Sequence, residues 1–255
     1  MSLSKNKFPI LEYDNDRESI LMPGPDNSNK LPARCVVSFS DYPYKFAEEM
    51  NAKVHSEFVT CTKAYKIFLT KYSGHDVCFC EVPLGASASV QLVDYLFLSG
   101  VSQIIASGSC GALIDIPENK ILVPIKALRD EGVSYHYLKP ARFIVLNRKA
   151  INAIEQSLNN ASINFDKCIT WTTDGFFRET KKMVEYRKKE GCQVVEMECA
   201  AMAACAEFRN SIFGHILFSG DSLADAEKHD QRSWGTSSIE KAFLLSLDAV
   251  MRITE

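Results

Sequence analysis

Residues 193–208 read QVVEMECAAMAACAEF, and this stretch decides the fold of the chain. Val194 and Val195 form a short apolar run that predicts the end of a buried strand, and a helix rich in Ala, Met and Cys follows. Glu196 and Glu198 lie at the junction, where open α/β sheets bind ligands beyond the carboxyl ends of their strands. An ordinary structural role is also open, because a carboxylate in the first turn commonly stabilises a buried helix.

The composition fits one globular α/β domain with a sizeable core. The chain has 255 residues, of which 46% are hydrophobic and 24% charged. A net charge of −3 gives no reason to expect nucleic acid as a partner. No apolar run approaches the roughly 20 residues of a membrane span, and the first residues lack a secretory signal. We expect residues 1–18 to be an N-terminal extension and residues 19–255 to form one domain.

The nine cysteines indicate a reducing, cytoplasmic compartment. Most of them lie inside apolar segments, and Cys78 and Cys80 are expected on one face of a strand. The sequence contains no CxxC pair, which speaks against a zinc site. We therefore expect reduced thiols that pack as small hydrophobic side chains, and no metal.

Apolar runs bounded by turn residues predict the other elements. Helices are expected at residues 44–50, 86–99, 146–158, 181–189 and 237–253. Strands are expected at residues 19–22, 35–37, 66–71, 77–82, 101–107, 121–123, 168–172 and 212–218. Ser73-Gly74 predicts a hairpin turn, and residues 129–137 predict a loop that covers a substrate. The order of strands and helices indicates βαβ units in a parallel or mixed sheet.

Several predicted strands end in a glycine-rich or polar tip, and in one sheet several of these tips would converge. Glycines allow a ligand to approach closely, and exposed backbone N–H groups suit anions. Phe176 or Phe177 would stack on a flat ring or else pack in the core. Asp221 would act as a general acid if burial raises its pKa, or else cap the next turn. The tips are Gly24, Gly85, and residues 108–111, 173–178, 196–198 and 219–221.

Four motifs, in this order, resemble the hexameric nucleoside phosphorylase family, which includes purine nucleoside and uridine phosphorylases. They are Met22-Pro23-Gly24, Gly108-Ser109-Cys110-Gly111, Val195-Glu196-Met197-Glu198 with its Ala-rich helix, and Gly220-Asp221. The resemblance spans residues 20–232. It implies a single α/β domain with a twisted mixed sheet of barrel character, flanked by helices. It also implies a homo-oligomer built from dimers, up to a hexamer, in which a neighbouring subunit contributes to each site.

The resemblance also implies how a nucleoside is held. Met197 and Glu198 are similar to the pair that binds the ribose, with Glu198 on the 2′- and 3′-hydroxyls. Phe176 looks like the aromatic residue that stacks on the base, and Arg178 falls where uridine phosphorylases place polar groups that read it. Asp221 matches the acid that protonates N7 of a purine. The arginine that partners this acid would be Arg232.

The implied phosphate site is less complete. Gly24, Gly108 and Ser109 match its glycine loop and its serine. The family usually adds three arginines, and Ala106, Ser28 and Lys63 stand in their places, with Lys63 at the position that a neighbouring subunit lends. A desolvated phosphate dianion needs compensating charge. Lysine lacks the bidentate fork of arginine, so Lys63 and the nearby Lys30 and Arg34 are partial substitutes.

Three functions follow. The first is phosphorolysis of a nucleoside, with inorganic phosphate as co-substrate and no other cofactor. The second is hydrolysis by a nucleosidase of the same superfamily, which the missing arginines favour, although no acid follows the first strand to activate water. The third is a nucleoside-binding protein without activity, against which the intact Glu198 and Asp221 speak. Asp221 favours a purine, whereas residues 176–178 and 135–136 favour a uridine or broad nucleoside substrate, which we expect.

Overall fold

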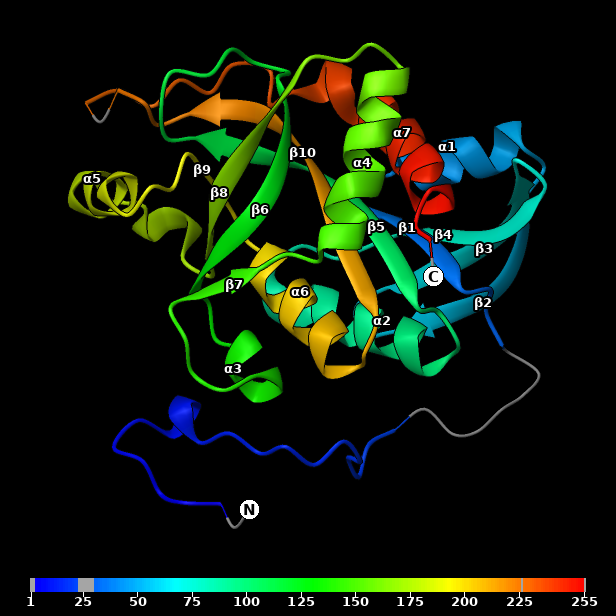
Figure 1. Ribbon diagram of the computed structural model, residues 1–255, viewed down its shortest axis with the longest axis horizontal. Helices are drawn as coiled ribbons and strands as arrows, with labels where there is room; N and C mark the ends of the chain where they lie inside the picture. The colour runs from blue at the N-terminus through cyan, green and yellow to red at the C-terminus, as the bar shows by residue number, and fades with distance from the viewer. Residues whose placement is uncertain (1–2, 23–29, 226, 255) are drawn as a thin grey trace.

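A computed structural model describes residues 3–22, 30–225 and 227–254. Within these residues the strands form one mixed sheet in the order β10-β6-β8-β9-β5-β1-β4-β3-β2, and β7 pairs with β6 (Figure 1). Because β10 also pairs with β5, the first five strands of this order close into a barrel. The bounds are β1 Arg34–Ser38, β2 Lys53–Val59, β3 Ala64–Tyr72, β4 His75–Glu81, β5 Gln103–Ala112, β6 Ile121–Asp130, β7 Phe143–Val145, β8 Phe165–Thr173, β9 Val194–Glu196 and β10 Ile212–Ser222.

The helices cover both faces of the sheet. Helices α4 and α7 pack against each other on one side, and α2 packs against α6 on the other (Figure 1). The predicted fold class, a twisted mixed sheet with barrel character and flanking helices, is therefore confirmed. The bounds are α1 Tyr42–Glu49, α2 Ala86–Leu98, α3 Ser134–Tyr137, α4 Arg148–Asn160, α5 Lys181–Lys189, α6 Cys199–Phe208 and α7 Ile239–Met251, with short 3-10 turns η1 Pro9–Leu11, η3 Phe176–Arg178 and η4 Thr236–Ser238.

Local sequence explains where several elements begin and end. Ser73 and Gly74 both have positive φ, at 49° and 79°, which is the turn that joins two antiparallel strands with the correct twist, and the predicted hairpin of β3 and β4 is confirmed. The side chain of Asn147 accepts hydrogen bonds from two backbone N–H groups at the start of α4. Thr180 does the same once for α5, whose predicted bounds are confirmed.

Three predictions of elements are wrong. Residues 108–111 do not end a strand, because β5 runs on to Ala112 and pairs with β10 on one side and β9 on the other. Residues 129–137 are not one loop, since β6 reaches Asp130 and α3 begins at Ser134. Residues 19–22 form no strand: no neighbouring strand pairs with them, and Ile20 and Leu21 are fully exposed. Strands β2 and β7 were not predicted.

The cysteines behave as small core residues. Eight of the nine are buried, Cys61 is exposed, and all are free thiols. Among the described residues no group of histidine, cysteine or acidic side chains is arranged to hold a metal ion. None of the helices in the described part of the chain is long and apolar enough to cross a membrane.

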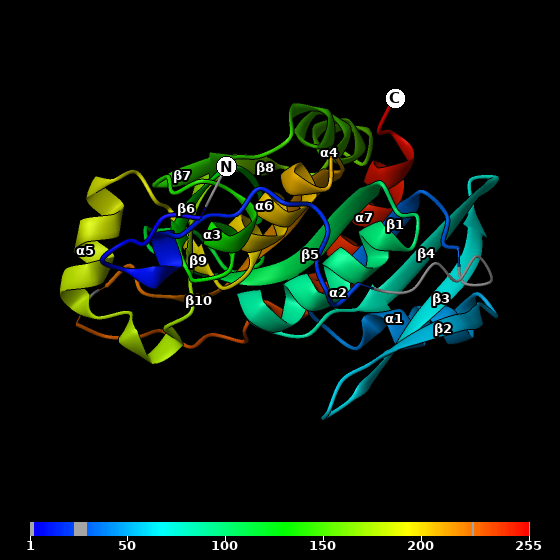
Figure 2. The same cartoon turned by 90° about the horizontal axis from the view of Figure 1, so that it is seen from below.

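The segment before the sheet lies across the outside of the helices. Figure 2 shows it passing beneath α3 and α6. The guanidinium of Arg17 donates to the carbonyl of Phe208 at the end of α6, and Arg209 donates back to the carbonyl of Arg17 at 2.9 Å. These contacts attach the segment to the domain near the C-terminal end of α6.

Candidate active site

Two buried carboxylates at the start of α6 have different surroundings. One oxygen of Glu196 accepts from the backbone N–H groups of Glu198 and Cys199 at 2.8 and 2.6 Å. Its other oxygen accepts from the hydroxyls of Thr170 and Thr172 at 3.0 and 2.6 Å. Glu196 therefore has the ordinary structural role: it caps α6 and ties it to β8, with both oxygens satisfied.

Glu198 is buried but keeps hydrogen-bonding capacity. It occupies the N-cap position of α6, yet its side chain does not cap the helix. One carboxyl oxygen accepts from the backbone N–H of Gly85, 2.5 Å away at the start of α2, and the other from Met197 at 3.3 Å. Burial, followed by the charge of Glu196, raises the pKa of Glu198 to about 8. Met197 is half-buried beside it.

A glycine brings Asp221 close to β9, the strand that leads to Glu198. Gly111 of β5 pairs with Val195 of β9. A Cβ at Gly111 would lie 3.0 Å from Val195 Cγ1 and 3.2 Å from Asp221 Oδ1, so the missing side chain lets β9 and the Asp221 carboxylate approach β5 together. Asp221 is 7% exposed and near the end of β10. Asp221 therefore packs beside the strand whose end leads into Glu198.

The partner of Asp221 is a histidine. Nε2 of His229 lies 2.8 Å from Asp221 Oδ2. The predicted partner, Arg232, instead contacts Asp230 at 3.4 Å and the carbonyl of Gly220 at 3.5 Å. Sequence reasoning missed His229, although a histidine eight residues after a strand-end acid was a usable signal.

A second acid near Asp221 was also missed. Glu179 directly follows η3 and is partly buried. Burial, and then the charge of Asp221, raises the pKa of Glu179 to about 7. No sequence pattern marks this residue, because it precedes a charged, exposed helix and resembles a surface glutamate.

The predicted base-stacking residues form an exposed turn. Phe176 is 43% exposed and Phe177 91% exposed, with ring centroids 5.0 Å apart in an edge-to-face arrangement. The alternative that they pack in the core is therefore wrong. Arg178 is exposed, and its side-chain stem packs over Gly175 at the start of the turn. Large exposed aromatic rings next to buried acids are available to a planar ligand.

Serine hydroxyls gather where β1 and β5 run side by side. Ser38 Oγ lies 2.9 Å from Ser40 Oγ and 3.2 Å from Ser107 Oγ. Ser109 is exposed, in contrast to its buried neighbours on the strand, so its hydroxyl is open to a ligand. These groups can hydrogen-bond an anion or water but carry no charge.

The surroundings of Gly108 are aromatic and neutral. A Cβ at Gly108 would meet the ring of Phe39 at 2.9 Å and Nε2 of His215 at 3.4 Å. His215 pairs with Ala106 across β10 and β5. Burial lowers the pKa of His215 to about 3, so the ring is uncharged at neutral pH. Neither Phe39 nor His215 therefore supplies a cation near Ala106.

Of the three basic residues considered for phosphate, Lys63 lies near the serine hydroxyls, because its partner Glu81 pairs with Ser38, and the other two lie at the opposite edge. Nζ of Lys63, in the turn between β2 and β3, lies 2.6 Å from both carboxyl oxygens of Glu81. Arg34 begins β1, at the end of the strand opposite to Ser38. Lys30 packs beside Gly100, ahead of β5, at that same opposite edge. Gly24, with Ser28, lies outside the described residues.

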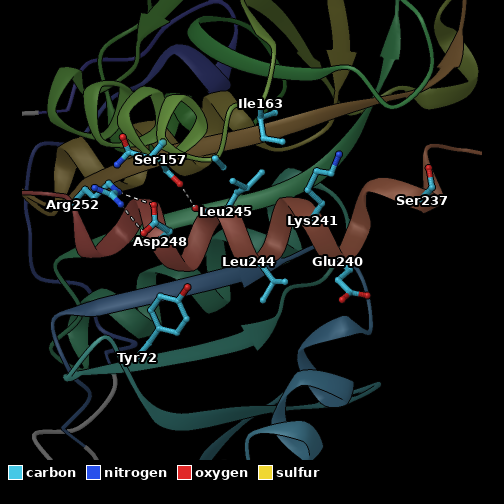
Figure 3. A pocket seen from close by; sticks show the side chains of 12 residues that line it. Tyr72, Ser157, Ile163, Ser237, Glu240, Lys241, Leu244, Leu245, Asp248 and Arg252 are labelled. Carbon is cyan, nitrogen blue, oxygen red and sulfur yellow. Dashed lines mark hydrogen bonds and ion pairs between the residues drawn. The ribbon is translucent and has the colours of Figure 1, made fainter.

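A cavity elsewhere in the molecule is distinct from this edge. It has a volume of about 630 Å³ and lies between α4, α7 and the end of β3 (Figure 3). Several of its polar groups pair with each other: Arg252 with Asp248 at 2.7 Å, and the hydroxyl of Ser157 with the carbonyl of Leu245 at 3.1 Å. Glu198, Asp221 and Ser109 do not line it. We therefore place the candidate active site at the barrel edge.

Comparison with known proteins identifies the family of the chain. Residues 33–250 match the family model described as the phosphorylase superfamily. The chain belongs to this superfamily. It is an enzyme of the nucleoside phosphorylase and nucleosidase group, and the predicted resemblance is confirmed. The matched residues begin after Met22-Pro23-Gly24.

Three relatives illustrate the range of this superfamily. Guanosine phosphorylase of Halorubrum lacusprofundi is 24% identical over 76% of this chain and 84% of its own length. The 5′-methylthioadenosine/S-adenosylhomocysteine nucleosidase of Buchnera aphidicola is 27% identical over 63% of this chain and 74% of its own. The crystal structure of uridine phosphorylase from Vibrio fischeri aligns with a TM-score of 0.73 and 22% identity, covering 89% of this chain and 93% of that one.

Proposed function

We propose that this superfamily member is a nucleoside phosphorylase. It would cleave the N-glycosidic bond of a uridine or a broad range of (deoxy)ribonucleosides with phosphate, giving a free base and a pentose 1-phosphate. The observation that supports the proposal is the packing of Asp221 and Val195 against Gly111, because Val195 leads directly into the start of α6, where Glu198 lies buried. One acid is then available for the pentose and another for the leaving base.

Glu198 and Met197 bind the sugar in this proposal. With a pKa of about 8, the Glu198 carboxyl holds its proton at neutral pH. A protonated carboxyl donates one hydrogen bond and accepts others, which suits the adjacent 2′- and 3′-hydroxyls. Met197 supplies an apolar contact to the face of the sugar. These contacts hold the pentose while its ring gains positive charge in the transition state.

The base lies against the exposed turn. Phe176 stacks on its ring, and Arg178 contacts its polar edge. Asp221 donates a proton to a ring nitrogen as the bond to C1′ breaks, which makes the base a better leaving group. The electron pair of the broken bond stays with the base.

Phosphate would bind at Gly108 and the open hydroxyl of Ser109. Its charge would be balanced by Lys63 of a second copy of the chain, in a homo-oligomer built from dimers. The exposed position of Lys63 at a hairpin turn supports this role, although within its own chain it pairs with Glu81. The relatives named as phosphorylases support phosphate as the co-substrate.

Hydrolysis is the second candidate, and a specific observation favours it. The surroundings of Gly108 contain Phe39 and a neutral His215, neither of which compensates a dianion. The named nucleosidase relative shows that the superfamily includes hydrolysis. Water bound by the serine hydroxyls near Ser38 would then replace phosphate.

One experiment separates these functions. The purified protein is incubated with a panel of purine and pyrimidine nucleosides, with and without phosphate, and the sugar product is identified. Phosphorolysis predicts pentose 1-phosphate and a rate that depends on phosphate. Free pentose at a rate independent of phosphate would establish hydrolysis instead. Binding without turnover of any nucleoside would leave only a binding protein.

A further inference from the structure

His229 is held against Asp221 by the chain that follows β10. Backbone hydrogen bonds in both directions join Ser222 to Asp230, at 2.8 and 3.0 Å, and return the chain to the strand end. His229 Nε2 then lies 2.8 Å from Asp221 Oδ2. The indole of Trp234 lies near the imidazole, with ring centroids 6.1 Å apart. The returning chain therefore holds His229 against Asp221 through its backbone and its side chains.

The two side chains differ in their access to water. The Asp221 side chain is 10% exposed, whereas that of His229 is 49% exposed. A buried general acid must regain its proton from somewhere after each turnover. His229 connects the buried carboxylate to solvent through one hydrogen bond.

We propose that His229 is a positioning and proton-supplying residue that reprotonates Asp221 with protons taken from solvent; the inference rests on the proposed function. The imidazolium donates its Nε2 proton to the Asp221 carboxylate, leaving a neutral imidazole and a neutral carboxylic acid. Asp221 passes that proton to the leaving base, while the electron pair of the broken bond remains on the base. The imidazole then regains a proton from water.

Other titratable groups lie around Asp221. The charge of Asp221 acts on the Glu179 carboxyl, which follows η3, and on the Cys110 thiol of β5. On the returning chain, Asp230 pairs with Arg232, and Glu227 pairs with Lys181 of α5. Cys110 is a buried, protonated thiol, because burial raises its pKa. No cation among the described residues competes with His229 for the Asp221 carboxylate in the salt bridges of the structure.

The test compares two substrates in His229→Gln. One is the best nucleoside from the panel, and the other is 4-nitrophenyl β-D-ribofuranoside, whose leaving group departs as a stable anion without protonation. We expect kcat on the nucleoside to fall about 10- to 100-fold with little change in KM. On the nitrophenyl riboside kcat should change less than about 2-fold, because its leaving group needs no proton from Asp221. A purely structural effect would lower both rates together.

A double variant and a control complete the test. In an Asp221→Asn background, adding His229→Gln should cost no further activity, since the histidine acts through Asp221. His75→Gln, at the exposed start of β4, should match the wild-type protein on both substrates. Equal losses on both substrates, an additive double variant, or an unaffected nucleoside rate in a folded His229→Gln would overturn the proton supply. A wild-type protein that turns over neither substrate would overturn the proposed function itself.

Discussion

At the scale of single residues, Glu196 and Glu198 show that identical side chains have different roles at different positions. Both are buried and two residues apart. The two oxygens of Glu196 accept hydrogen bonds from four donors within the protein, whereas those of Glu198 accept hydrogen bonds from only two backbone N–H groups. The first therefore holds the junction of β9 and α6 together, and the second retains capacity for a ligand.

This difference predicts opposite effects of the same substitution. Glu198→Gln should lower kcat/KM by about 10²- to 10³-fold, since an amide cannot release a proton and become the anion that stabilises the positively charged pentose in the transition state. Its melting temperature should not fall, because the amide keeps an acceptor for Gly85. Glu196→Gln should lower the free energy of unfolding by about 1–3 kcal/mol, because an amide nitrogen replaces one satisfied acceptor. Steady-state kinetics and urea unfolding measure the two. Equal stability loss in both variants would contradict the division of roles.

The residues of the site were predictable where they stand in a motif and not where only the fold brings them together. Glu198 and Asp221 are recognisable from their strand-end motifs, and the structure shows both side chains buried. His229 and Glu179 reach Asp221 through a returning loop and a short turn. Contacts of that kind depend on tertiary structure that periodicity does not encode.

At the scale of elements, the barrel strands extend beyond their apolar runs. The apolar pattern of β5 and β10 ends near residues 107 and 218, yet both strands continue for several residues. Pairing on both sides holds these polar, glycine-rich ends in the sheet, and a sequence window cannot register a partner distant in the chain. Most other elements were predictable as helix or strand, because glycines and polar capping residues mark the ends of helices such as α2 and α5.

Two glycines in neighbouring strands give a matched pair of variants. Gly111→Ala would place a Cβ 3.0–3.2 Å from Val195, Leu223 and Asp221, which displaces the acid. We expect kcat/KM to fall about 10-fold or more, since small displacements of catalytic groups are costly. Gly214→Ala would meet Ala150 and Ile154 of α4 at 2.8 and 3.0 Å, and overpacking there should cost about 1–3 kcal/mol of stability. Activity per folded Gly214→Ala molecule should be normal, and a kinetic defect in that variant would argue against the assignment.

At the scale of the whole molecule, the phosphate site is proposed to need a second copy. Lys63→Ala should then raise the apparent KM for phosphate by about 10-fold, because one exposed cation is removed from the anion. Lys71→Ala is the control, since Lys71 is a lysine of β3 that also pairs with an acid, Asp76, and is more exposed than Lys63. An unchanged KM in Lys63→Ala would place the anion elsewhere.

Two buried groups with opposite shifts determine how stability of the whole fold depends on pH. Glu198 has a pKa raised from 4.5 to about 8, so the folded state holds a proton that the unfolded chain releases, and stability falls as pH rises through this window. His215 has a pKa lowered from 6.5 to about 3, so between these values the unfolded chain binds a proton that the folded state does not bind. Stability therefore falls as pH drops through that window.

Glu179 adds to the Glu198 slope, because its pKa is also raised from 4.5, to about 7. Between pH 4.5 and 6.5 the single slope of His215 therefore cancels only one of the two acid slopes. We expect maximum stability near pH 4.5, with losses of about 1.4 kcal/mol per pH unit on the acid side and up to about twice that on the alkaline side. Urea unfolding at a series of pH values measures this profile. Glu198→Gln should make the alkaline side shallower, leaving the contribution of Glu179, and His215→Leu should flatten the acid side. Since His215 has two buried nitrogens without partners among the described residues, His215→Leu should also raise the maximum stability by about 1–3 kcal/mol. An alkaline slope that survives unchanged in Glu198→Gln would show that this carboxyl is already ionised in the folded protein.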